Sequence, residues 1–389
     1  MFPSVSDYRD AARRRLPRFA FDYLDGAAED GDALRRNAES YRRTLLRPRV
    51  LRDLTSCTTE TGWFGVVGAA PMAVGPTGLN GLFRHRADEQ LALAAARHGL
   101  PFILSTASTS LLEDVRKAAP DADLWLQLYV QQDRRIAEDI MRRARHAGYR
   151  CLLLTVDTPV HGKRDHDIRN GFKLPIRLTP RLVSDVLRHP RWGWQMLRHG
   201  GPQLLNIAYS LGEVPELSRQ AASLSRAMDL SLQWRDIAWV REHWSGPVLV
   251  KGIQTAEDAM LAARHGVDGI VISNHGGRQL GSAMPPLDIL PSVRAAVGDT
   301  LRVFVDGGVR RGADAIKAVA CGADGVLLGR APLYGLAAMG FKGVDEILTL
   351  LREEATITLR LLGCASLDEL SPDHVCRMRM AAVADTPTH

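Results

Sequence analysis

Short apolar runs recur along the chain from residue 72 onward, and each is followed by a segment whose apolar positions repeat at helical spacing. The runs are rich in Val, Ile and Leu and do not alternate with polar residues, which is typical of parallel strands buried on both faces. Eight strand–helix units predict a closed (β/α)8 barrel of the TIM type. The runs lie at 72–76, 102–105, 124–129, 151–157, 248–252, 269–274, 303–308 and 325–330.

The helical segments between these runs end on glycine, as helices often do. The clearest examples are "DEQLALAAARHG" at 88–99, "AEDAMLAARHG" at 256–266 and "GADAIKAVACG" at 312–322. A doubly wound open sheet is the alternative α/β fold. Its glycine fingerprint, G-x-G-x-x-G after the first strand, is absent from this sequence, which favours the barrel.

Several stretches stand outside the strand–helix repeat. Residues 1–70 precede it and are expected to form an N-terminal cap, and the connection between the fourth and fifth strands contains an insertion at 173–215. The segment 343–363 reads as one amphipathic helix packed on the barrel. We therefore expect a single domain over 1–389, with the barrel at 71–363 and a C-terminal tail at 364–389.

Composition narrows the class of protein. The chain is 46% hydrophobic and 24% charged, as ordinary globular proteins are. The net charge of +6 is small for 389 residues and no basic arm is present, so nucleic acid is not an expected partner. No metal site is expected. Five scattered cysteines without a C-x-x-C pair favour a reducing, cytoplasmic compartment. No apolar run reaches the ~18 residues of a membrane span, and no signal peptide is expected.

Polar or glycine residues follow every one of the eight apolar runs. For one such residue, a capping or turn role is the ordinary explanation. At all eight ends together, they favour a site at the carboxyl ends of the strands, where barrel enzymes carry their chemistry. These residues are Thr77 and Gly78, Ser105 and Thr106, Gln127 and Tyr129, Thr155 and Asp157, Lys251, Asn274 and His275, Asp306, Gly307 and Gly308, and Gly329 and Arg330.

Two glycine turns, after the seventh and eighth strands, predict a phosphate site. "DGGVRRG" occupies 306–312 and "GR" occupies 329–330. Barrels hold phosphate here with backbone N–H groups and a helix start, and Arg310 and Arg330 would add charged donors. Because tight turns also use glycine for conformational reasons, it is the position of these turns that carries the prediction.

Three charged residues suggest chemistry at the mouth of the barrel. Lys251 ends an apolar strand, and it is either a Schiff-base nucleophile or a fixed cation beside an anionic cofactor. His275 is placed to act as a general base whose ring Asp157 orients. Arg278 has the planar fork that binds a carboxylate through two hydrogen bonds. These residues suit a phosphate-bearing cofactor and a small carboxylate substrate.

"SNHGGRQL" at 273–280 together with "DGGVRRG" makes the chain resemble the FMN-dependent L-2-hydroxy acid oxidase and dehydrogenase family over essentially its whole length. Within this family it is most similar to the membrane-associated L-mandelate dehydrogenases. The shared phrases are "GPTGLNG" at 75–81, "LSTAS" at 104–108, "HPRW" at 189–192 and "VDEILTLL" at 344–351.

The resemblance implies a role for each candidate residue. His275 would be the base paired with Asp157, with Tyr129 and Lys251 also catalytic. Substrate contacts would come from Tyr23, Tyr129, Arg164 and Arg278. FMN would be held by Thr77, Gly78, Ser105, Gln127, Thr155, Lys251, Asp306, Gly308, Arg310, Gly329 and Arg330.

Two departures from relatives bear on the reaction. Glycolate-type relatives carry a tryptophan where this chain has Ala107, which leaves room for an aryl group and favours (S)-mandelate, oxidised to benzoylformate. Oxygen-using relatives usually have alanine where this chain has Gly78, which favours a quinone acceptor. L-lactate dehydrogenase and an oxygen-using 2-hydroxy acid oxidase are the alternatives. The base could remove the α-hydrogen as a proton, or it could remove the hydroxyl proton while a hydride is transferred. Both mechanisms need the same residues, so the sequence does not distinguish them.

The insertion is rich in basic residues and tryptophan. Residues 173–200 hold six Lys or Arg against one acid, Asp185, with Trp192 and Trp194 among aliphatic side chains. This composition is typical of a membrane interface, although a soluble lid over the site explains it equally. The resemblance favours a monotopic anchor at 177–215, placing the enzyme on the cytoplasmic side of the inner membrane, and it implies a homotetramer.

Rival functions remain open at this point. One rival is another flavin barrel, such as type 2 isopentenyl diphosphate isomerase or a nucleotide dehydrogenase. The His-Gly-Gly-Arg cluster after the sixth strand argues against it. A pyridoxal phosphate barrel would use Lys251 as its Schiff base. A barrel without activity would serve only as a binding scaffold.

Overall fold

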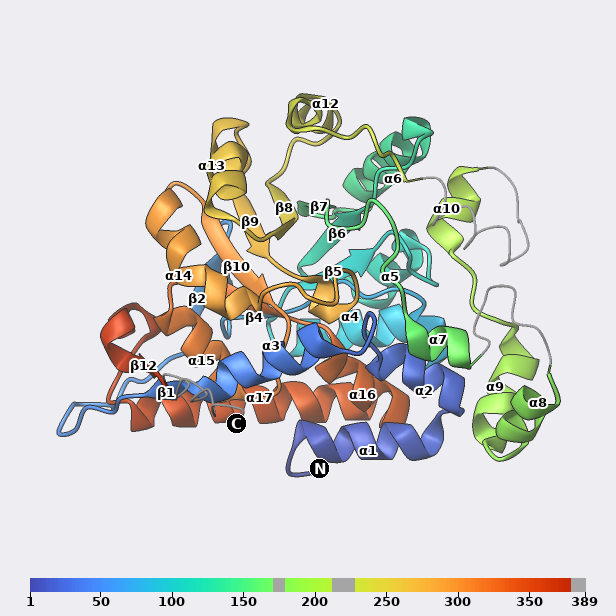
Figure 1. Ribbon diagram of the computed structural model, residues 1–389, viewed down its shortest axis with the longest axis horizontal. Coiled ribbons are helices and arrows are strands. Elements are labelled where there is room, and N and C mark those ends of the chain that lie inside the picture. Colours follow the sequence, from blue (N-terminus) through green and yellow to red (C-terminus); the bar gives the residue numbers. More distant parts are fainter. Residues whose placement is uncertain (171–178, 212–227, 379–389) are drawn as a thin grey trace, which may run out of the picture.

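Eight parallel strands close into a barrel in the order β10-β11-β4-β5-β6-β7-β8-β9 (Figure 1), which confirms the predicted fold and excludes the open sheet. The structure is a computed structural model that describes residues 1–170, 179–211 and 228–378. Six strands fall within the predicted apolar runs, while β8 ends one residue beyond its run and β10 begins one residue before its run. The strands are β4 (Met72–Val74), β5 (Phe102–Ser105), β6 (Leu124–Leu128), β7 (Cys151–Thr155), β8 (Val248–Ile253), β9 (Gly269–Ile272), β10 (Arg302–Asp306) and β11 (Gly325–Leu328).

A ring of helices covers the outside of the barrel. The glycines predicted to end α4, α13 and α15 have positive φ, at 62° for Gly99, 70° for Gly266 and 106° for Gly322. Only glycine adopts this backbone without steric cost, which is why these helices stop there. The helices that follow the strands are α4 (Ala87–Arg97), α5 (Leu112–Ala118), α6 (Arg134–His146), α12 (Ile237–His243), α13 (Ala256–Arg264), α14 (Pro286–Val297), α15 (Gly312–Ala320) and α16 (Arg330–Met339).

The interior of the barrel is a separate apolar core, closed at its amino end by a hairpin. This hairpin is β2 (Thr61–Trp63) and β3 (Val66–Gly68). Trp63 is fully buried and stacks on Phe304, with ring centroids 5.1 Å apart, and it meets Trp125 edge-on. Because aromatic rings fill this end, a ligand reaches the strands from the carboxyl end.

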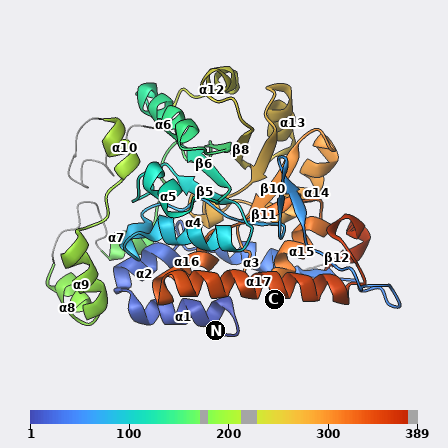
Figure 2. The same ribbon diagram turned by 180° about the vertical axis from the view of Figure 1, so that it is seen from behind.

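The N-terminal cap consists of α1 (Val5–Arg15), α2 (Arg18–Asp25) and α3 (Asp32–Arg43). Helix α1 packs on α16, and α3 packs on α14 and on the turn after β9. The helix predicted at 343–363 is α17 (Phe341–Leu361), which lies alongside α16 (Figure 2). The strand β12 (Val375–Arg377) pairs antiparallel with β1 (Thr44–Leu46), so the segment after the cap helices lies against the C-terminal segment.

The insertion lies to one side of the barrel (Figure 1) and includes α8 (Pro180–Leu187), α9 (Pro190–His199) and α10 (Leu205–Ser210), after α7 (Asp165–Arg169). Residues 173–178 and 212–215 of the predicted insertion lie outside the described residues, as do 379–389 of the tail. Trp192 does not face outward as its interfacial interpretation requires. Its Nε1 donates to the Leu82 carbonyl at 2.8 Å and its ring meets Phe19, because the indole fills the gap between α9 and the cap.

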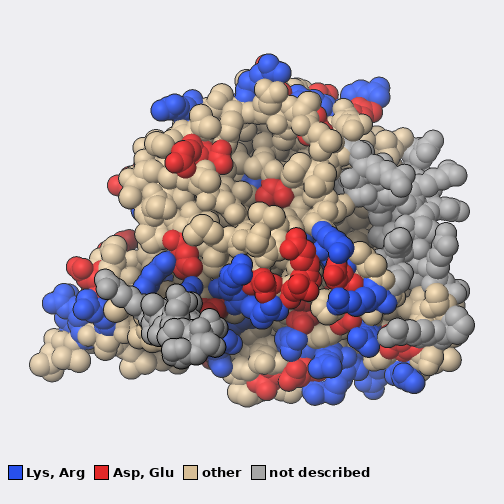
Figure 3. All heavy atoms as spheres, in the orientation of Figure 1, with Lys and Arg blue, Asp and Glu red and all other residues tan. Residues whose placement is uncertain are grey.

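Charged side chains on the face seen in Figure 3 are of both signs. Lys and Arg lie beside Asp and Glu across the lower half, over the cap helices, while the upper half is mostly uncharged. The described part of this face therefore has no separate basic block, in keeping with the modest net charge.

Candidate active site

A cavity of about 600 Å³ opens at the carboxyl ends of the strands, between the barrel and α2. The predicted site residues meet here, although they come from both ends and the middle of the chain. Gln127, Thr155 and Asp157 do not line the cavity and lie next to residues that do. Those that line it are Tyr23, Thr77, Gly78, Ser105, Tyr129, Arg164, Lys251, His275, Arg278, Asp306, Gly308, Arg310, Gly329 and Arg330.

His275 lies in the turn that leaves β9, with a strained backbone. Its φ is +57°, a left-handed conformation that costs a residue other than glycine on the order of 1–3 kcal/mol. Two contacts hold the turn: the His275 N–H donates to Ser273 Oγ at 3.0 Å, and Asn274 Oδ1 accepts from the Gly277 N–H at 3.1 Å. This turn is the reason that the imidazole points into the cavity.

Asn274 also joins this turn to the N-terminal cap. Its Nδ2 donates to Asn37 Oδ1 at 2.7 Å, and Asn37 Nδ2 donates back to Asn274 Oδ1 at 2.8 Å. Both side chains are buried. Asn37 also packs against Gly307 and Gly308, where an added Cβ would come within 2.8 Å of its side chain or backbone. The cap therefore braces the ends of β9 and β10 together.

The His275 ring lies between a carboxylate and a phenol. Nδ1 is 3.0 Å from Asp157 Oδ1, and Nε2 is 3.5 Å from the Tyr129 hydroxyl. Burial works to raise the pKa of Asp157, but His275 and Lys251 outweigh it and the pKa lies below its ordinary value. An ionised Asp157 accepts a hydrogen bond from the Nδ1–H of His275. This fixes the tautomer in which Nε2, on the cavity side, is the basic nitrogen.

Two arginines converge on Tyr23. The Arg278 guanidinium lies 4.9 Å from the ring centroid and that of Arg164 lies 5.8 Å from it. Arg278 Nη1 is held by the carbonyls of Tyr23 and Gly26, at 2.8 and 3.0 Å. Burial lowers the pKa of Arg278, and the neighbouring Arg164 cation lowers it further. Two neighbouring arginine cations favour an anionic ligand at this wall of the cavity.

Lys251 is a buried, paired cation. Its Nζ donates to Ser273 Oγ at 2.8 Å and lies 3.1 Å from Asp306 Oδ2. Burial alone would lower the pKa of this ammonium, but the Asp306 and Asp157 carboxylates reverse the effect and the pKa is raised. A Schiff-base lysine needs a lowered pKa, so the pairing favours the fixed-cation interpretation.

The donors and turns around the cavity fit FMN. Gln127 Nε2 and Thr155 Oγ1 are buried and make no hydrogen bond within the described ranges, so a ligand with ring nitrogens and carbonyls would satisfy them. In the 306–312 turn the N–H groups of Arg310 and Arg311 donate to Asp314 and that of Gly312 donates to Glu354. A phosphate would therefore meet the first half of the turn, where Gly307 and Gly308 line the cavity, and the start of α16. Arg310 Nη1 donates to the Val309 carbonyl at 2.7 Å.

Arg330, predicted to bind phosphate, also has partners in the N-terminal cap. Its three guanidinium nitrogens donate to the carbonyls of Leu24, Gly276 and Gly26, at 3.2, 3.0 and 2.6 Å. These contacts tie α2 to the barrel, so the side chain positions the cap in addition to lining the cavity.

The sequence did not point to several lining residues. His161 and Asp167 follow β7 at a distance from the strand end; their only signal is proximity to Arg164 in the chain. Burial, followed by the Arg164 and His275 charges, lowers the pKa of His161 to about 4, so its ring is neutral at pH 7. Leu79, Phe83 and Leu204 also line the cavity and gave no sequence signal, since apolar residues are common in any core.

The fold and site define a barrel enzyme that binds a phosphate-bearing cofactor and a small anion. The model of the family described as FMN-dependent dehydrogenase matches residues 12–377. The chain belongs to this family, and its cofactor is FMN.

Relatives with different substrates match the chain almost equally. (S)-mandelate dehydrogenase of Pseudomonas putida is 43% identical over 96% of this chain and 93% of its own length. L-lactate dehydrogenase of Caulobacter sp. (strain K31) is 44% identical over 94% of this chain and 96% of its own. A crystal structure of (S)-mandelate dehydrogenase, described as a monotopic membrane protein, matches with a TM-score of 0.93 at 43% identity, covering 97% of this chain and 100% of that one. The chain is an FMN-dependent 2-hydroxy acid dehydrogenase.

Proposed function

We propose that the enzyme oxidises (S)-mandelate to benzoylformate and passes the electrons to a membrane quinone. The observation that carries the substrate is a cavity with an arginine pair and a histidine on one side and an apolar lining at Leu79, Phe83 and Ala107. The near-equal identity to mandelate and lactate dehydrogenases does not separate the two acids. L-lactate is the second candidate, and an oxygen-using oxidase is the alternative reaction.

The proposed chemistry divides among the residues of the cavity. Arg278 and Arg164 bind the substrate carboxylate, since a guanidinium group can bind a carboxylate through two parallel charge-assisted hydrogen bonds. His275 Nε2 accepts a proton from the substrate while Asp157 holds the Nδ1–H. Bound FMN would supply the acceptor for the two electrons and for the second hydrogen that the substrate loses. Lys251 holds a fixed positive charge that would stabilise the negative charge developing on the flavin.

Tyr129 supplies a hydroxyl donor at the same position. Burial, followed by the Asp157 charge, raises its pKa, so the phenol stays protonated at neutral pH. Its hydroxyl oxygen lies 3.5 Å from His275 Nε2, and the residue lines the cavity. We assign it a substrate-orienting role.

The variant Ala107→Trp tests the substrate. The indole would fill the space beside Leu79 and Phe83, so kcat/KM for (S)-mandelate should fall at least tenfold more than that for L-lactate, within the ~10–200-fold range of pocket discrimination. Steady-state kinetics with a soluble dye as acceptor measures both. Equal losses on the two acids would place the phenyl group elsewhere.

Gly78 bears on the proposed acceptor. A Cβ at this position would lie 2.9 Å from the Ala107 Cβ, so Gly78 and Ala107 are packed as a pair and alanine at 78 forces the neighbouring turn to move.

Enzyme reduced by mandelate should be reoxidised faster by a water-soluble ubiquinone than by air-saturated buffer. Faster reoxidation by oxygen would favour the oxidase alternative.

The surface of the insertion supports peripheral membrane binding. Trp194 is 63% exposed and Leu197 78% exposed on α9, next to the exposed Arg191 and Arg198. In the described part of the chain, each helix is too short or too polar to cross a bilayer. A surface that combines exposed apolar side chains with arginines is suited to lie in the headgroup region of anionic lipid.

Cosedimentation with phosphatidylglycerol vesicles tests this surface. Wild type should pellet at low salt and less so as salt screens the arginines. The double variant Trp194→Asp, Leu197→Asp should stay in the supernatant. Leu361→Asp, at a 72% exposed position on α17, is the matched control and should pellet like wild type. Wild type that stays in solution with these vesicles would leave the insertion as a soluble lid.

We extend the proposal to the cytoplasmic face of the inner membrane and to a homotetramer, both supported by the resemblance to the membrane-associated branch of the family. Light scattering of the purified holoenzyme gives the number of subunits directly.

A further inference from the structure

One apolar wall of the cavity belongs to the insertion. Leu204 immediately precedes α10, is 1% exposed, and lines the cavity together with Ala107 and Phe83 from the barrel loops. Within the described stretch of the insertion, 179–211, it is the one residue that does so. A segment outside the strand–helix repeat therefore contributes directly to the shape of the substrate pocket.

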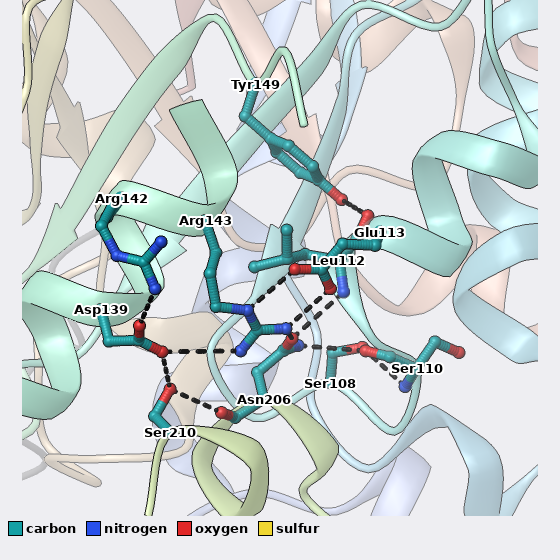
Figure 4. Close-up of polar contacts among 10 residues, drawn as sticks. All are labelled: Ser108, Ser110, Leu112, Glu113, Asp139, Arg142, Arg143, Tyr149, Asn206 and Ser210. Atoms are coloured by element: carbon teal, nitrogen blue, oxygen red, sulfur yellow. Dashed lines mark hydrogen bonds and ion pairs between the residues drawn. The ribbon is translucent and has the colours of Figure 1, made fainter. Parts of the chain in front are cut away.

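Asn206, two residues on, fixes this wall to the barrel (Figure 4). Its Oδ1 accepts from the Leu112 N–H at 3.1 Å and lies 3.4 Å from an Arg143 nitrogen, and its Nδ2 donates to the Ser110 carbonyl at 3.0 Å. Helix α5 has no side-chain cap from its own N-cap residue, Leu111. Asn206 takes that place from the insertion, which satisfies an N–H that would otherwise be buried without a partner.

A buried arginine holds the rest of α10. Arg143 on α6 makes two hydrogen bonds to Glu113, at 2.8 and 2.7 Å, and lies 4.1 Å from the Tyr209 ring centroid. Burial works to raise the pKa of Glu113, but the Arg143 hydrogen bonds outweigh it and the pKa is lowered, so the pair is ionised. At the far end of α10, Ser210 Oγ donates to Asp139 at 2.7 Å.

The same network reaches the loop that carries Ala107. The Ser110 carbonyl accepts both from Asn206 Nδ2 and from Ser108 Oγ, at 3.0 and 2.9 Å (Figure 4). Ser108 follows Ala107 directly. Asn206 thus links Leu204 and Ala107, two lining residues that come from the insertion and from the β5–α5 loop.

We propose that Leu204 is a specificity-determining residue that contacts the α-substituent of the 2-hydroxy acid, and that Asn206 is its positioning residue. The substrate class is a 2-hydroxy acid with a bulky apolar side chain, and this inference rests on the proposed function. In a water-excluding pocket, an apolar contact of this size discriminates between substrates by roughly 10–200-fold. The insertion then has two roles: α9 exposes Trp194 and Leu197 on the surface, and Leu204, just before α10, lies at the substrate pocket.

The experiment compares three variants on a series of acids, L-lactate, L-2-hydroxybutyrate, L-2-hydroxyisocaproate and (S)-mandelate. Leu204→Ala should lower kcat/KM for the two largest acids about tenfold and leave L-lactate within about twofold. Asn206→Ala should shift preference in the same direction, mainly through KM. Ser210→Ala on the same helix removes the hydroxyl that contacts Asp139 and the Asn206 backbone carbonyl, but it leaves the Asn206 side-chain contacts with Leu112 and Ser110 in place, and should keep the wild-type order.

A structural role alone would lower activity on all acids together, so the ratio between acids is the decisive measurement. Equal losses across the series in Leu204→Ala would overturn the pocket assignment. A changed ratio in Leu204→Ala with an unchanged ratio in folded, FMN-loaded Asn206→Ala would overturn the positioning role. If the wild-type enzyme prefers L-lactate, the proposal that mandelate is the substrate is refuted. The comparison of Leu204→Ala with wild type across the acids still tests the role of Leu204.

Discussion

Replacing His275 by glutamine is expected to slow flavin reduction by (S)-mandelate about 10²–10⁴-fold while FMN stays bound. The imidazole faces the cavity with Nε2, and the residue is held by Ser273 and Asp157 rather than by the cofactor-binding turns. Anaerobic bleaching of the flavin absorbance measures the rate, and the spectrum of the resting enzyme gives FMN content.

The strained backbone of His275 calls for a second variant. Asparagine tolerates positive φ better than most residues, so His275→Asn keeps the turn while removing the base. Both variants should lose activity to a similar extent. A loss below about tenfold in either, with FMN bound, contradicts the assignment of His275 as general base.

Asp157→Asn is expected to have the next largest effect, on the order of 10²–10⁴-fold. In serine proteases the corresponding exchange costs about 10⁴-fold because the histidine takes the wrong tautomer. The lowered pKa of Asp157 means that folding favours its ionised form, so its contribution to stability is present above the ordinary carboxyl pKa and is lost as pH falls below it. The variant should therefore lose activity without losing FMN, and its stability should depend less on pH in the acid range.

A variant of Gln279 separates the effect of the position of Asp157 from the effect of its charge. Its Nε2 donates to the backbone carbonyls of Asp157 and Val160, both at 3.0 Å. Gln279→Leu loosens the segment but leaves the carboxylate in place, so it should be impaired far less than Asp157→Asn. Equal impairment would mean that the placement of residue 157, not its charge, supports His275.

The barrel could be predicted from the sequence because each strand and helix is encoded locally. The residues Cys151–Leu154 of β7 are apolar throughout because both faces of the strand are buried, and the glycine that ends a helix is visible as a single letter. The strand-end residues were also predictable, since the fold brings the ends of all eight strands to one rim. Once the fold is known, Lys251, His275 and Asp306 must meet.

Contacts between distant segments could not be predicted in this way. Leu204 is an ordinary leucine in a basic, aromatic insertion, and only the path of the chain brings it to the cavity. Trp192 looked interfacial from composition, yet burial against Phe19 removes it from the surface. The carbonyl partners of Arg330 were equally hidden, because backbone acceptors have no sequence signature.

The paired amides of Asn37 and Asn274 also constrain when the active site can form. The two residues are 237 positions apart, so the turn that carries His275 is braced only after most of the chain has left the ribosome. The cap helix must remain unengaged until the sixth of the eight barrel strands, β9, has been made, and contacts of this sequence separation form slowly. Catalytic competence is therefore a late event in biogenesis, and an amino-terminal fragment, however well folded, is inert.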